Sequence, residues 1–528
     1  MQTRNILWIM CDQLRWDYLS CAGHPTLQTP NIDWLAENGV RFSNAFVQSP
    51  ICGPSRMSYY TGRYPSTHGA VANDWPLKVG EMTLGDHLRP LGMRAVLCGK
   101  THMRADVEGM SRLGISPDSV IGARVSECGF DVWERHDGLY PDPKPDQGYN
   151  RFLAGRGYDA ANPWHDNANS GRDAEGRIRS GWFLENAPFA AAIDAEEGET
   201  PYIIDRAIQF VEGADAEPWL LHISLIKPHW PLVAPPPYND MYGPKDIPPR
   251  NRSEAERIDP HPVFAAFQNH AESRAYSNDT VRDTAVPVYM GLIKQIDDEI
   301  GRLLDFLRQT GRLDSTMIAF CSDHGDYLGD HWLGEKDLFH APSVKVPLIV
   351  YDPSSTADAS RGTVCDALVE AIDLAPTFIE TAGGVPAAHV IEGRSLYPFL
   401  RGEPVAEWRE AAFSEYDYVI KEAGRVLGQG LRDCKLYMVR THRWFAMFAP
   451  PFRPMLFDLQ SDPNELNDLG ATPPAGVIEE LKAHLLSWAL KRKSATTVSE
   501  SQIEELLAFE GGTDGIYYGV WNREGALP

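Results

Sequence analysis

Short apolar runs alternate with amphipathic or polar segments along most of the chain. Five runs rich in aliphatic and β-branched residues are bounded by polar or turn residues, which predicts buried strands at 5–11, 93–98, 219–226, 316–322 and 345–351. From 287 to 310 apolar residues recur at helical spacing on one stripe, and Gly311 follows as a stop signal. Strands alternating with helices predict an α/β fold with a mostly parallel sheet sandwiched by helices.

Two stretches interrupt this alternation. Residues 128–200 are rich in Gly, Pro, Asp and Asn, and 232–262 are rich in proline, so we expect long surface excursions of the kind that carry function. After about residue 392 the apolar runs become isolated and indicate hairpins and a late helix, near 476–491. We therefore expect a catalytic domain at 1–400, a smaller C-terminal α+β domain at 401–495 and an arm at 496–528.

Composition limits the class of protein. The 528 residues are 43% hydrophobic and 23% charged, which is typical of a globular enzyme. No apolar run approaches the roughly 20 residues that cross a bilayer, and the first run is too short for a secretory signal, so we expect a cytoplasmic protein without a membrane partner. Eight scattered cysteines predict neither disulfides nor a structural zinc site, and a net charge of −24 argues against nucleic acid.

Polar side chains follow four of the predicted strands. They are Asp12 with Gln13, Lys100 with His102, Lys227 with His229, and Asp323 with His324. Ligands of open α/β sheets bind beyond the carboxyl ends of the strands, so these groups are candidates for one site. A single aspartate at a strand end is more often a turn or cap residue, but four such ends together are hard to explain as caps.

One subset of these residues has the donor atoms of a metal site. Asp12, Gln13, Asp323 and His324 supply oxygen ligands and one imidazole nitrogen. Oxygen ligands alone favour calcium or magnesium, whereas an imidazole shifts the preference toward Mn²⁺ and other transition ions. We predict manganese, with Ca²⁺ and Zn²⁺ as alternatives. The competing interpretation is that His324 is a hydrogen-bonded turn residue.

The segment SPICGPSRMSYYTGRYP at 49–65 places Cys52 at the start of a predicted helix. Pro54 suits a first helical turn, and Gly62 suits a helix end. The exposed amides of a helix N-terminus favour negative charge on a nucleophile or a bound oxyanion. A cysteine alone is usually a packing residue, and a thiolate nucleophile with His102 or His229 as base is the first chemical alternative.

CGPSRMSYYTGR at 52–63 resembles the sulfatase signature, in which the cysteine is oxidised to formylglycine. The segments GKTH at 99–102, KPHWP at 227–231, SDHGDYLGDHWLGEK at 322–336 and LFDLQSDPNELNDL at 456–469 resemble sulfatase segments in the same order. The resemblance covers nearly the whole chain. It implies the fold of the alkaline phosphatase superfamily, an α/β core with a smaller C-terminal domain.

The same resemblance implies a mechanism. Formylglycine derived from Cys52 would hydrate to a geminal diol, and residue 52 would also be a metal ligand. One oxygen of the diol would bind the divalent metal, lose its proton more easily and attack sulfur or phosphorus in line. Arg56 would hold the nucleophile and offset its charge, and Lys100 and Lys336 would clamp the substrate oxygens.

Two histidines complete this mechanism. His229 would contact the sulfuryl group or protonate the leaving oxygen. His102 would remove the proton of the second hydroxyl group, which expels sulfate and regenerates the aldehyde.

Two departures from the usual sulfatase pattern bear on the substrate. The Gln13 and His324 ligands are similar to those of the phosphonate monoester hydrolase branch, which uses manganese, and Asn73 resembles a substrate-contacting asparagine of that branch. Lys100 and His102, however, resemble the sulfatase pair. We therefore expect an arylsulfatase that also accepts phosphonate monoesters and phosphodiesters. The alternative is an enzyme whose main activity is the hydrolysis of phosphonate monoesters or phosphodiesters.

Other classes fit the sequence less well. A non-catalytic binder of sulfated or phosphorylated ligands would not need the intact set of nucleophile, metal ligands and cations. Phosphomutases and nucleotide pyrophosphatases of the superfamily have Ser or Thr, not cysteine, as the nucleophile.

Two macromolecular partners are expected. A formylglycine-generating maturation enzyme would act on Cys52. The C-terminal arm carries Tyr517, Tyr518 and Trp521 beside glycines and cannot build a core alone, which favours a homo-oligomer, either dimer or tetramer. Packing of the arm on its own subunit is the alternative.

Overall fold

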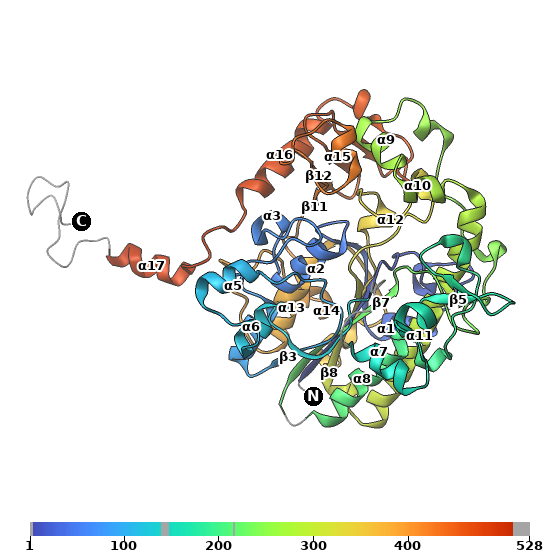
Figure 1. Ribbon diagram of the computed structural model, residues 1–528. Helices are drawn as coiled ribbons and strands as arrows, with labels where there is room; N and C mark the ends of the chain where they lie inside the picture. The colour runs from blue at the N-terminus through green and yellow to red at the C-terminus, as the bar shows by residue number, and fades with distance from the viewer. Residues whose placement is uncertain (1–3, 139–146, 215–216, 510–528) are drawn as a thin grey trace, which may run out of the picture.

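The computed structural model describes residues 4–138, 147–214 and 217–509, and its centre is an eight-stranded sheet (Figure 1). Its spatial order is β10 (Thr363–Glu370), β2 (Val40–Phe46), β9 (Leu348–Tyr351), β8 (Thr316–Ser322), β1 (Asn5–Asp12), β7 (Trp219–Pro228), β3 (Arg94–Gly99) and β4 (Asp131–Arg135). Strand β9 is antiparallel to both neighbours, and all other pairs are parallel. The predicted mostly parallel sheet is confirmed.

The five predicted strands are present, with ends that differ from the prediction by up to three residues, and three further strands of the large sheet were not predicted. The strand expected at 345–351 begins only at Leu348. Strands β2, β4 and β10 were not predicted, because they alternate apolar and polar residues or leave apolar side chains exposed. At the sheet edge, for example, Val132 and Trp133 of β4 are 46% and 40% exposed. Edge strands lack the continuous apolar run that marks a strand buried on both faces.

Helices cover both faces of the sheet. Alternate side chains of β1 enter two separate hydrophobic cores. One core is closed by α1 (Pro30–Asn38), α8 (Glu199–Gly213) and α11 (Asp279–Gln309), and the other by α2 (Cys52–Thr61), α4 (Leu84–Leu88) and α13 (Leu374–Thr381). The helix predicted at 287–310 is the later part of α11, which begins at Asp279 and contains Pro287 in its interior.

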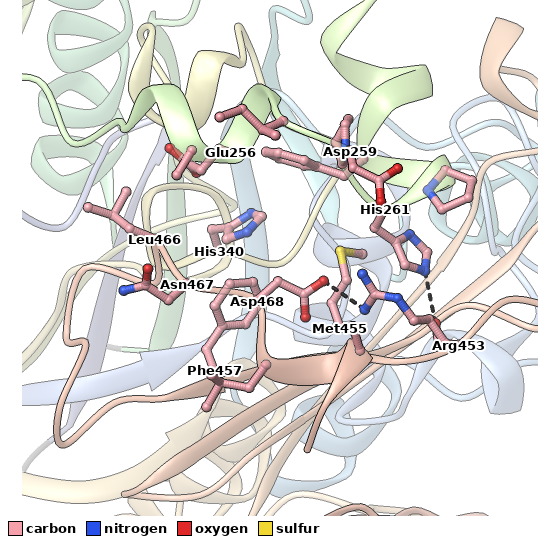
Figure 2. Close-up of a pocket in the computed structure, with 17 residues that line it drawn as sticks. Glu256, Asp259, His261, His340, Arg453, Met455, Phe457, Leu466, Asn467 and Asp468 are labelled. Carbon is pink, nitrogen blue, oxygen red and sulfur yellow. Dashed lines mark hydrogen bonds and ion pairs between the residues drawn. The ribbon is translucent and has the colours of Figure 1, made fainter. Parts of the chain in front are cut away.

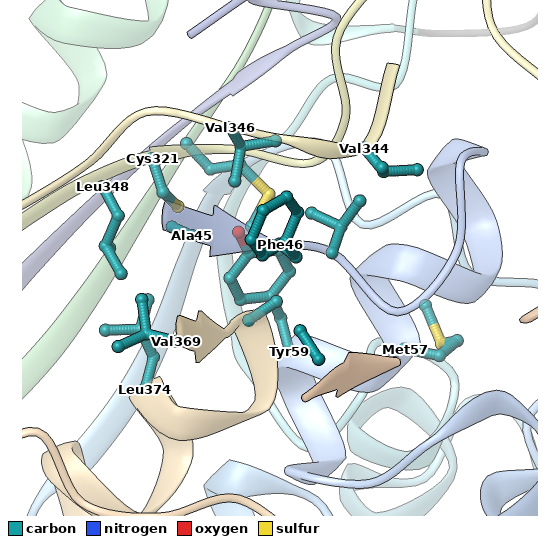
Figure 3. Packing of buried hydrophobic residues seen from close by; sticks show 14 of the residues in the cluster. Ala45, Phe46, Met57, Tyr59, Cys321, Val344, Val346, Leu348, Val369 and Leu374 are labelled. Carbon is teal, nitrogen blue, oxygen red and sulfur yellow. The ribbon is translucent and has the colours of Figure 1, made fainter. Parts of the chain in front are cut away.

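Helix α2 is buried along its whole length, which is unusual for so polar a segment. Met57 and Tyr59 pack among side chains from the sheet and from the segment before β9, including Ala45, Phe46 and Val346 (Figure 3). The Tyr59 hydroxyl donates a hydrogen bond to the carbonyl oxygen of Ser322 at 2.9 Å. These contacts fix the second half of α2 against the end of β8.

A second sheet follows the first along the chain. It is antiparallel, in the order β11 (Ala412–Asp417), β12 (Lys435–Arg440), β13 (Trp444–Phe448) and β14 (Met455–Asp458), and α16 (Val477–Leu490) packs on it. The predicted small C-terminal α+β unit is confirmed, whereas its boundaries at 401 and 495 stay predictions. Helix α17 (Glu500–Phe509) stands apart from the body in Figure 1. Tyr517, Tyr518 and Trp521 lie outside the described residues.

The long excursions contain short elements. Besides β4, residues 128–200 form α7 (Gly148–Gly155) and a hairpin of β5 (Ser170–Arg172) and β6 (Ile178–Ser180). The remaining α-helices are short: α3 (Pro65–His68), α5 (Val107–Leu113), α6 (Val120–Val125), α9 (Pro262–Gln268), α10 (Ala271–Tyr276), α12 (Ala341–Val344), α14 (Tyr397–Leu400) and α15 (Glu422–Val426). Across the described ranges, the helices lack the combination of length and apolar character that a membrane span requires.

Candidate active site

The carboxyl ends of four neighbouring strands meet at one edge of the large sheet. Strands β8, β1, β7 and β3 are adjacent in that order, and they deliver Asp323, Asp12, His229 and Lys100. All four residues are at most 2% exposed. The convergence predicted from the strand ends is therefore observed, and the four side chains are buried.

Four potential metal ligands lie at the centre of this site. Ligand atoms of Asp12, Cys52, Asp323 and His324 all lie within 4.8 Å of one another, and all four residues are buried. The Cys52 sulfur is 3.0 Å from His324 Nε2 and 3.7 Å from Asp12 Oδ1. Cys52 begins α2, so the predicted position at a helix N-terminus is also observed.

Buried cations balance the two carboxylates. Arg56, which is fully buried, donates from Nε to Asp323 Oδ2 at 2.7 Å and from Nη2 to Asp12 Oδ2 at 3.2 Å. Lys100 Nζ donates to the same oxygen of Asp12. Burial would raise the pKa of Asp12, but Lys100 and Arg56 outweigh burial and hold that pKa well below its ordinary range. The Asp12 carboxylate is thus kept in the ionised form that binds cations.

The surroundings of Cys52 favour negative charge at that position. Burial would raise the pKa of the Cys52 thiol, but Lys336 and His324 outweigh it and lower the pKa well below its ordinary value. Lys336 Nζ is 3.6 Å from the sulfur. A hydrogen bond from His102 acts in the same direction. A nucleophile at residue 52 would be stabilised in its anionic form.

The donor set fits a divalent cation. Burial would lower the pKa of His324, yet Asp323 and Cys52 raise it to about 9, so the surroundings of this imidazole favour positive charge at that position. Two carboxylates, an imidazole and an amide oxygen are ligands that Mn²⁺, Ca²⁺ or Zn²⁺ accept. The site can therefore hold a metal, and the donor set alone leaves the identity of that metal open.

Gln13 is held by a partner that the sequence analysis missed. Its side-chain amide donates to Asp326, and its Oε1 accepts a hydrogen bond from Lys336 Nζ at 2.8 Å. Asp326 is 3% exposed and thus fixes which end of the amide faces the site. The sequence contained a signal that Asp326 belongs to the site, because this residue follows His324 by two positions in the same loop.

His229 and Lys336 come together from distant segments. His229 Nε2 is 3.3 Å from Lys336 Nζ, and its Nδ1 is 2.7 Å from the carbonyl oxygen of Trp230. Burial would lower the pKa of Lys336, but Cys52 and Glu335 raise it, so its ammonium stays charged. His229 and the Lys336 ammonium therefore lie side by side next to Cys52.

The start of α2 is braced from outside the helix. Asn73 Oδ1 accepts a hydrogen bond from the backbone N–H of Gly53 at 2.8 Å. A Cβ atom at residue 53 would lie 2.9 Å from that oxygen, which explains a glycine beside Cys52. Ser224 was also missed in the sequence analysis: its hydroxyl oxygen accepts a hydrogen bond from Arg56 Nη1 at 2.6 Å. Its polar side chain within an apolar strand was the signal that could have identified it.

Cavity size alone would misplace the active site. A cavity of about 600 Å³ lies between residues 255–264, His340 and the β14 region, where Arg453 pairs with Asp468 (Figure 2). None of its lining residues belongs to the predicted site. A cavity of about 360 Å³, lined in part by Lys100, His102 and Asp137, borders the cluster around Cys52 and is the better candidate for substrate.

Comparisons with known proteins agree with this geometry. The sulfatase family profile matches residues 4–385, and that of the N-sulphoglucosamine sulphohydrolase C-terminal region matches residues 329–491. The multifunctional alkaline phosphatase superfamily protein PehA of Trinickia caryophylli is 30% identical, with 94% of this chain and 97% of that protein covered. An arylsulfatase of Clostridium perfringens is 28% identical, with 88% and 90% covered.

A solved structure is similar over nearly the full length. The phosphonate monoester hydrolase of Agrobacterium radiobacter superposes with a TM-score of 0.80 at 30% identity, covering 93% of this chain and 96% of that chain. The family profile spans most of the chain and includes the Cys52 segment and every strand end of the site. The chain therefore belongs to the sulfatase family, whose members imply a divalent metal and a formylglycine at the signature cysteine.

Proposed function

We propose that this protein hydrolyses sulfate monoesters, with aryl sulfates as its main substrates and phosphonate monoesters and phosphodiesters as secondary ones. The observation that carries the proposal is the position of Cys52, buried between potential metal ligands and the cations Lys100 and Lys336. An arylsulfatase and a phosphonate monoester hydrolase are both relatives. A site with these cations suits both substrate classes, because each substrate carries one negative charge.

The cofactors follow from the donor set. Asp12, Gln13, Asp323 and His324 would hold a divalent metal, and we propose Mn²⁺ because one ligand is an imidazole. When bound, the metal would supply Lewis acidity beside residue 52. Cys52 would be converted to formylglycine by a maturation enzyme. The mass of the tryptic peptide 42–56 distinguishes the thiol from the aldehyde and so tests the conversion.

The protein residues would then act in two half-reactions. In the first, an oxygen of the hydrated residue 52, after losing its proton to solvent, would bond to sulfur as the bond from sulfur to the leaving oxygen breaks, and His229 would give the leaving oxygen its proton. In the second, His102 takes the proton of the remaining hydroxyl, the bond from carbon to the sulfate oxygen breaks, and the aldehyde reforms. Sulfate leaves without water having to attack the hindered, anionic sulfur again.

The remaining side chains would stabilise charge and orientation. Lys100 and Lys336 would bind the nonbridging sulfuryl oxygens, where charge accumulates in the transition state. Arg56 would hold both metal-binding carboxylates in place through its two ion pairs. Asn73 would contact substrate near the start of α2, next to the backbone N–H of Gly53 to which it is hydrogen-bonded.

Phosphonate monoester hydrolysis is the second candidate. It is favoured by the Gln13 and His324 ligands and by the similarity to a solved phosphonate monoester hydrolase. The two candidates are separated by kcat/KM for 4-nitrophenyl sulfate and for a 4-nitrophenyl phosphonate monoester. A higher value for the sulfate supports our order, and a higher value for the phosphonate reverses it. Failure to hydrolyse either ester by protein with converted Cys52 would exclude both.

Removal of divalent ions provides a further prediction. Chelation should lower aryl sulfate turnover by about 100-fold or more, because the nucleophile loses its Lewis acid. Mn²⁺ should restore activity more fully than Ca²⁺ or Zn²⁺, whereas the Asp323→Asn variant should recover poorly with every ion. Activity and metal content are measured on the same samples. Full activity in protein shown to contain no metal would contradict the proposed site.

We also propose a cytoplasmic homo-oligomer. All eight cysteines are unpaired, as in a reducing compartment. Helix α17 exposes Ile503, Leu506 and Leu507 at 48%, 61% and 62%, an apolar set that a neighbouring subunit could cover. Deletion of residues 500–528 should lower the number of subunits per particle, as calculated from the mass measured by light scattering. An unchanged number of subunits would contradict a role of the arm in assembly.

A further inference from the structure

The loop that carries His229 is closed by a buried lysine with no part in the mechanism above. Lys227 is the penultimate residue of β7, and its side chain is 5% exposed. Its Nζ donates to the carbonyl oxygen of Pro231 at 2.9 Å and to Asn169 Oδ1 at 2.7 Å. One ammonium group thus joins the first residue of the 227–231 loop to the last, with His229 between them.

The ammonium is anchored to a helix on one face of the sheet. Glu199, the first residue of α8, has Oε2 at 3.4 Å from Lys227 Nζ. The same carboxylate accepts hydrogen bonds from Asn169 Nδ2 at 3.0 Å and from Trp164 Nε1 at 2.6 Å. His136 Nε2 lies 2.8 Å from its other oxygen. The 227–231 loop is therefore tied to a buried polar network, not only to its own strand.

This network is held by charge as well as by geometry. Burial would raise the pKa of Glu199, but Lys227 and His136 outweigh it and hold that pKa well below its ordinary range. Removing one partner of such a buried pair leaves an uncompensated charge, so the remaining groups must rearrange or admit water. Movement of the 227–231 loop is the direct consequence, because the ammonium is the link between its two ends.

The opposite side of His229 is fixed too. Its ring stacks on Trp230 with centroids 4.8 Å apart, and Trp230 Nε1 donates to Glu335. Nδ1 faces a backbone carbonyl at 2.7 Å, which leaves Nε2 directed at the site, 3.3 Å from Lys336 Nζ. A displacement of about 1 Å would take Nε2 out of hydrogen-bonding range of a leaving oxygen.

We propose that Lys227 is a positioning residue, which clamps the 227–231 loop so that His229 Nε2 faces the leaving-group oxygen. The inference rests on the proposed function of His229. Lys227 itself touches neither the candidate metal ligands nor the position of the nucleophile, since its hydrogen bonds and ion pair go to Asn169, Pro231 and Glu199. Its effect on the reaction would pass entirely through the histidine.

The test is a double-mutant cycle of Lys227→Met and His229→Ala, measured with aryl sulfates whose leaving phenols differ in pKa. Lys227→Met should lower kcat/KM by about 10- to 100-fold for poor leaving groups and much less for good ones, because proton donation matters most for a basic oxygen. In the His229→Ala background, Lys227→Met should change kcat/KM by less than about twofold.

Two further variants control for loss of folding. Lys294→Met removes a partly buried lysine that pairs with Asp297 and Asp298 on α11, and it should leave the leaving-group dependence unchanged. Glu199→Gln keeps the side-chain volume and loosens the same ammonium, so it should show the Lys227→Met trend in a milder form. Thermal unfolding of each variant identifies any that is not folded.

The outcomes separate the two claims. Additive effects of Lys227→Met and His229→Ala, or an equal loss for all leaving groups, would overturn the positioning role and leave the role of His229 intact. An unchanged leaving-group dependence in His229→Ala alone would overturn the acid role of His229 in the proposed function, and the inference with it. Non-additivity with a steeper leaving-group dependence in Lys227→Met supports the proposal.

Discussion

Cys52→Ala should abolish turnover of aryl sulfates, with kcat/KM falling by about 10⁴-fold or more, because the variant has no nucleophile and no precursor of one. The site would keep its cations and the candidate metal ligands other than residue 52, so substrate would still bind. The measurement is steady-state hydrolysis of 4-nitrophenyl sulfate. Cys365→Ala, which alters a half-buried cysteine of β10, is the matched control and should retain parental activity.

Cys52→Ser separates the formylglycine mechanism from an ordinary nucleophile. A serine can attack sulfur once, but its sulfate ester has no second hydroxyl from which a proton could be removed to expel sulfate. We expect a burst of one equivalent of phenol, then a stall, with a sulfuryl group retained on the peptide 42–56. Sustained turnover by Cys52→Ser would contradict the collapse to an aldehyde.

Arg56→Met should lower the free energy of unfolding by about 3–5 kcal/mol in chelator-treated protein, because it leaves two buried carboxylates without their shared cation. Arg56 is fully buried, and its hydrogen bonds reach Asp12 and Asp323 across the sheet edge. The measurement is denaturant unfolding followed by tryptophan fluorescence. A bound divalent ion supplies positive charge to the same carboxylates, so excess Mn²⁺ should reduce the loss.

The control for Arg56→Met is an exposed pair of the same kind. Arg443 is 56% exposed and lies 3.2 Å from Asp458, so Arg443→Met should unfold at the same denaturant concentration as the parent. If Arg56→Met also unfolded at the denaturant concentration of the parent, the buried ion pairs would not be a source of stability. A loss that Mn²⁺ did not reduce would argue against Asp12 and Asp323 as its ligands.

The interior of the fold could be predicted because strands buried on both faces are continuous apolar runs, as in β1, β7 and β8. The same runs located the candidate site, since the polar residues directly after them had to meet at one edge of a parallel sheet. The shortened β9 and the omitted β2, β4 and β10 show the limit of this signal. A strand that is short, near an edge or partly exposed has a pattern resembling that of a loop.

The sequence by itself determined the class of fold, the family resemblance and the residues at the strand ends, because each of these is written in local patterns. The tertiary structure decided which side chains are partners. Arg56 and Asp323 are 267 positions apart, and Lys227 and Asn169 are 58 apart, so no local pattern joins them. Their pairing follows from burial, because a charge that is removed from water must find a partner wherever the folded chain supplies one.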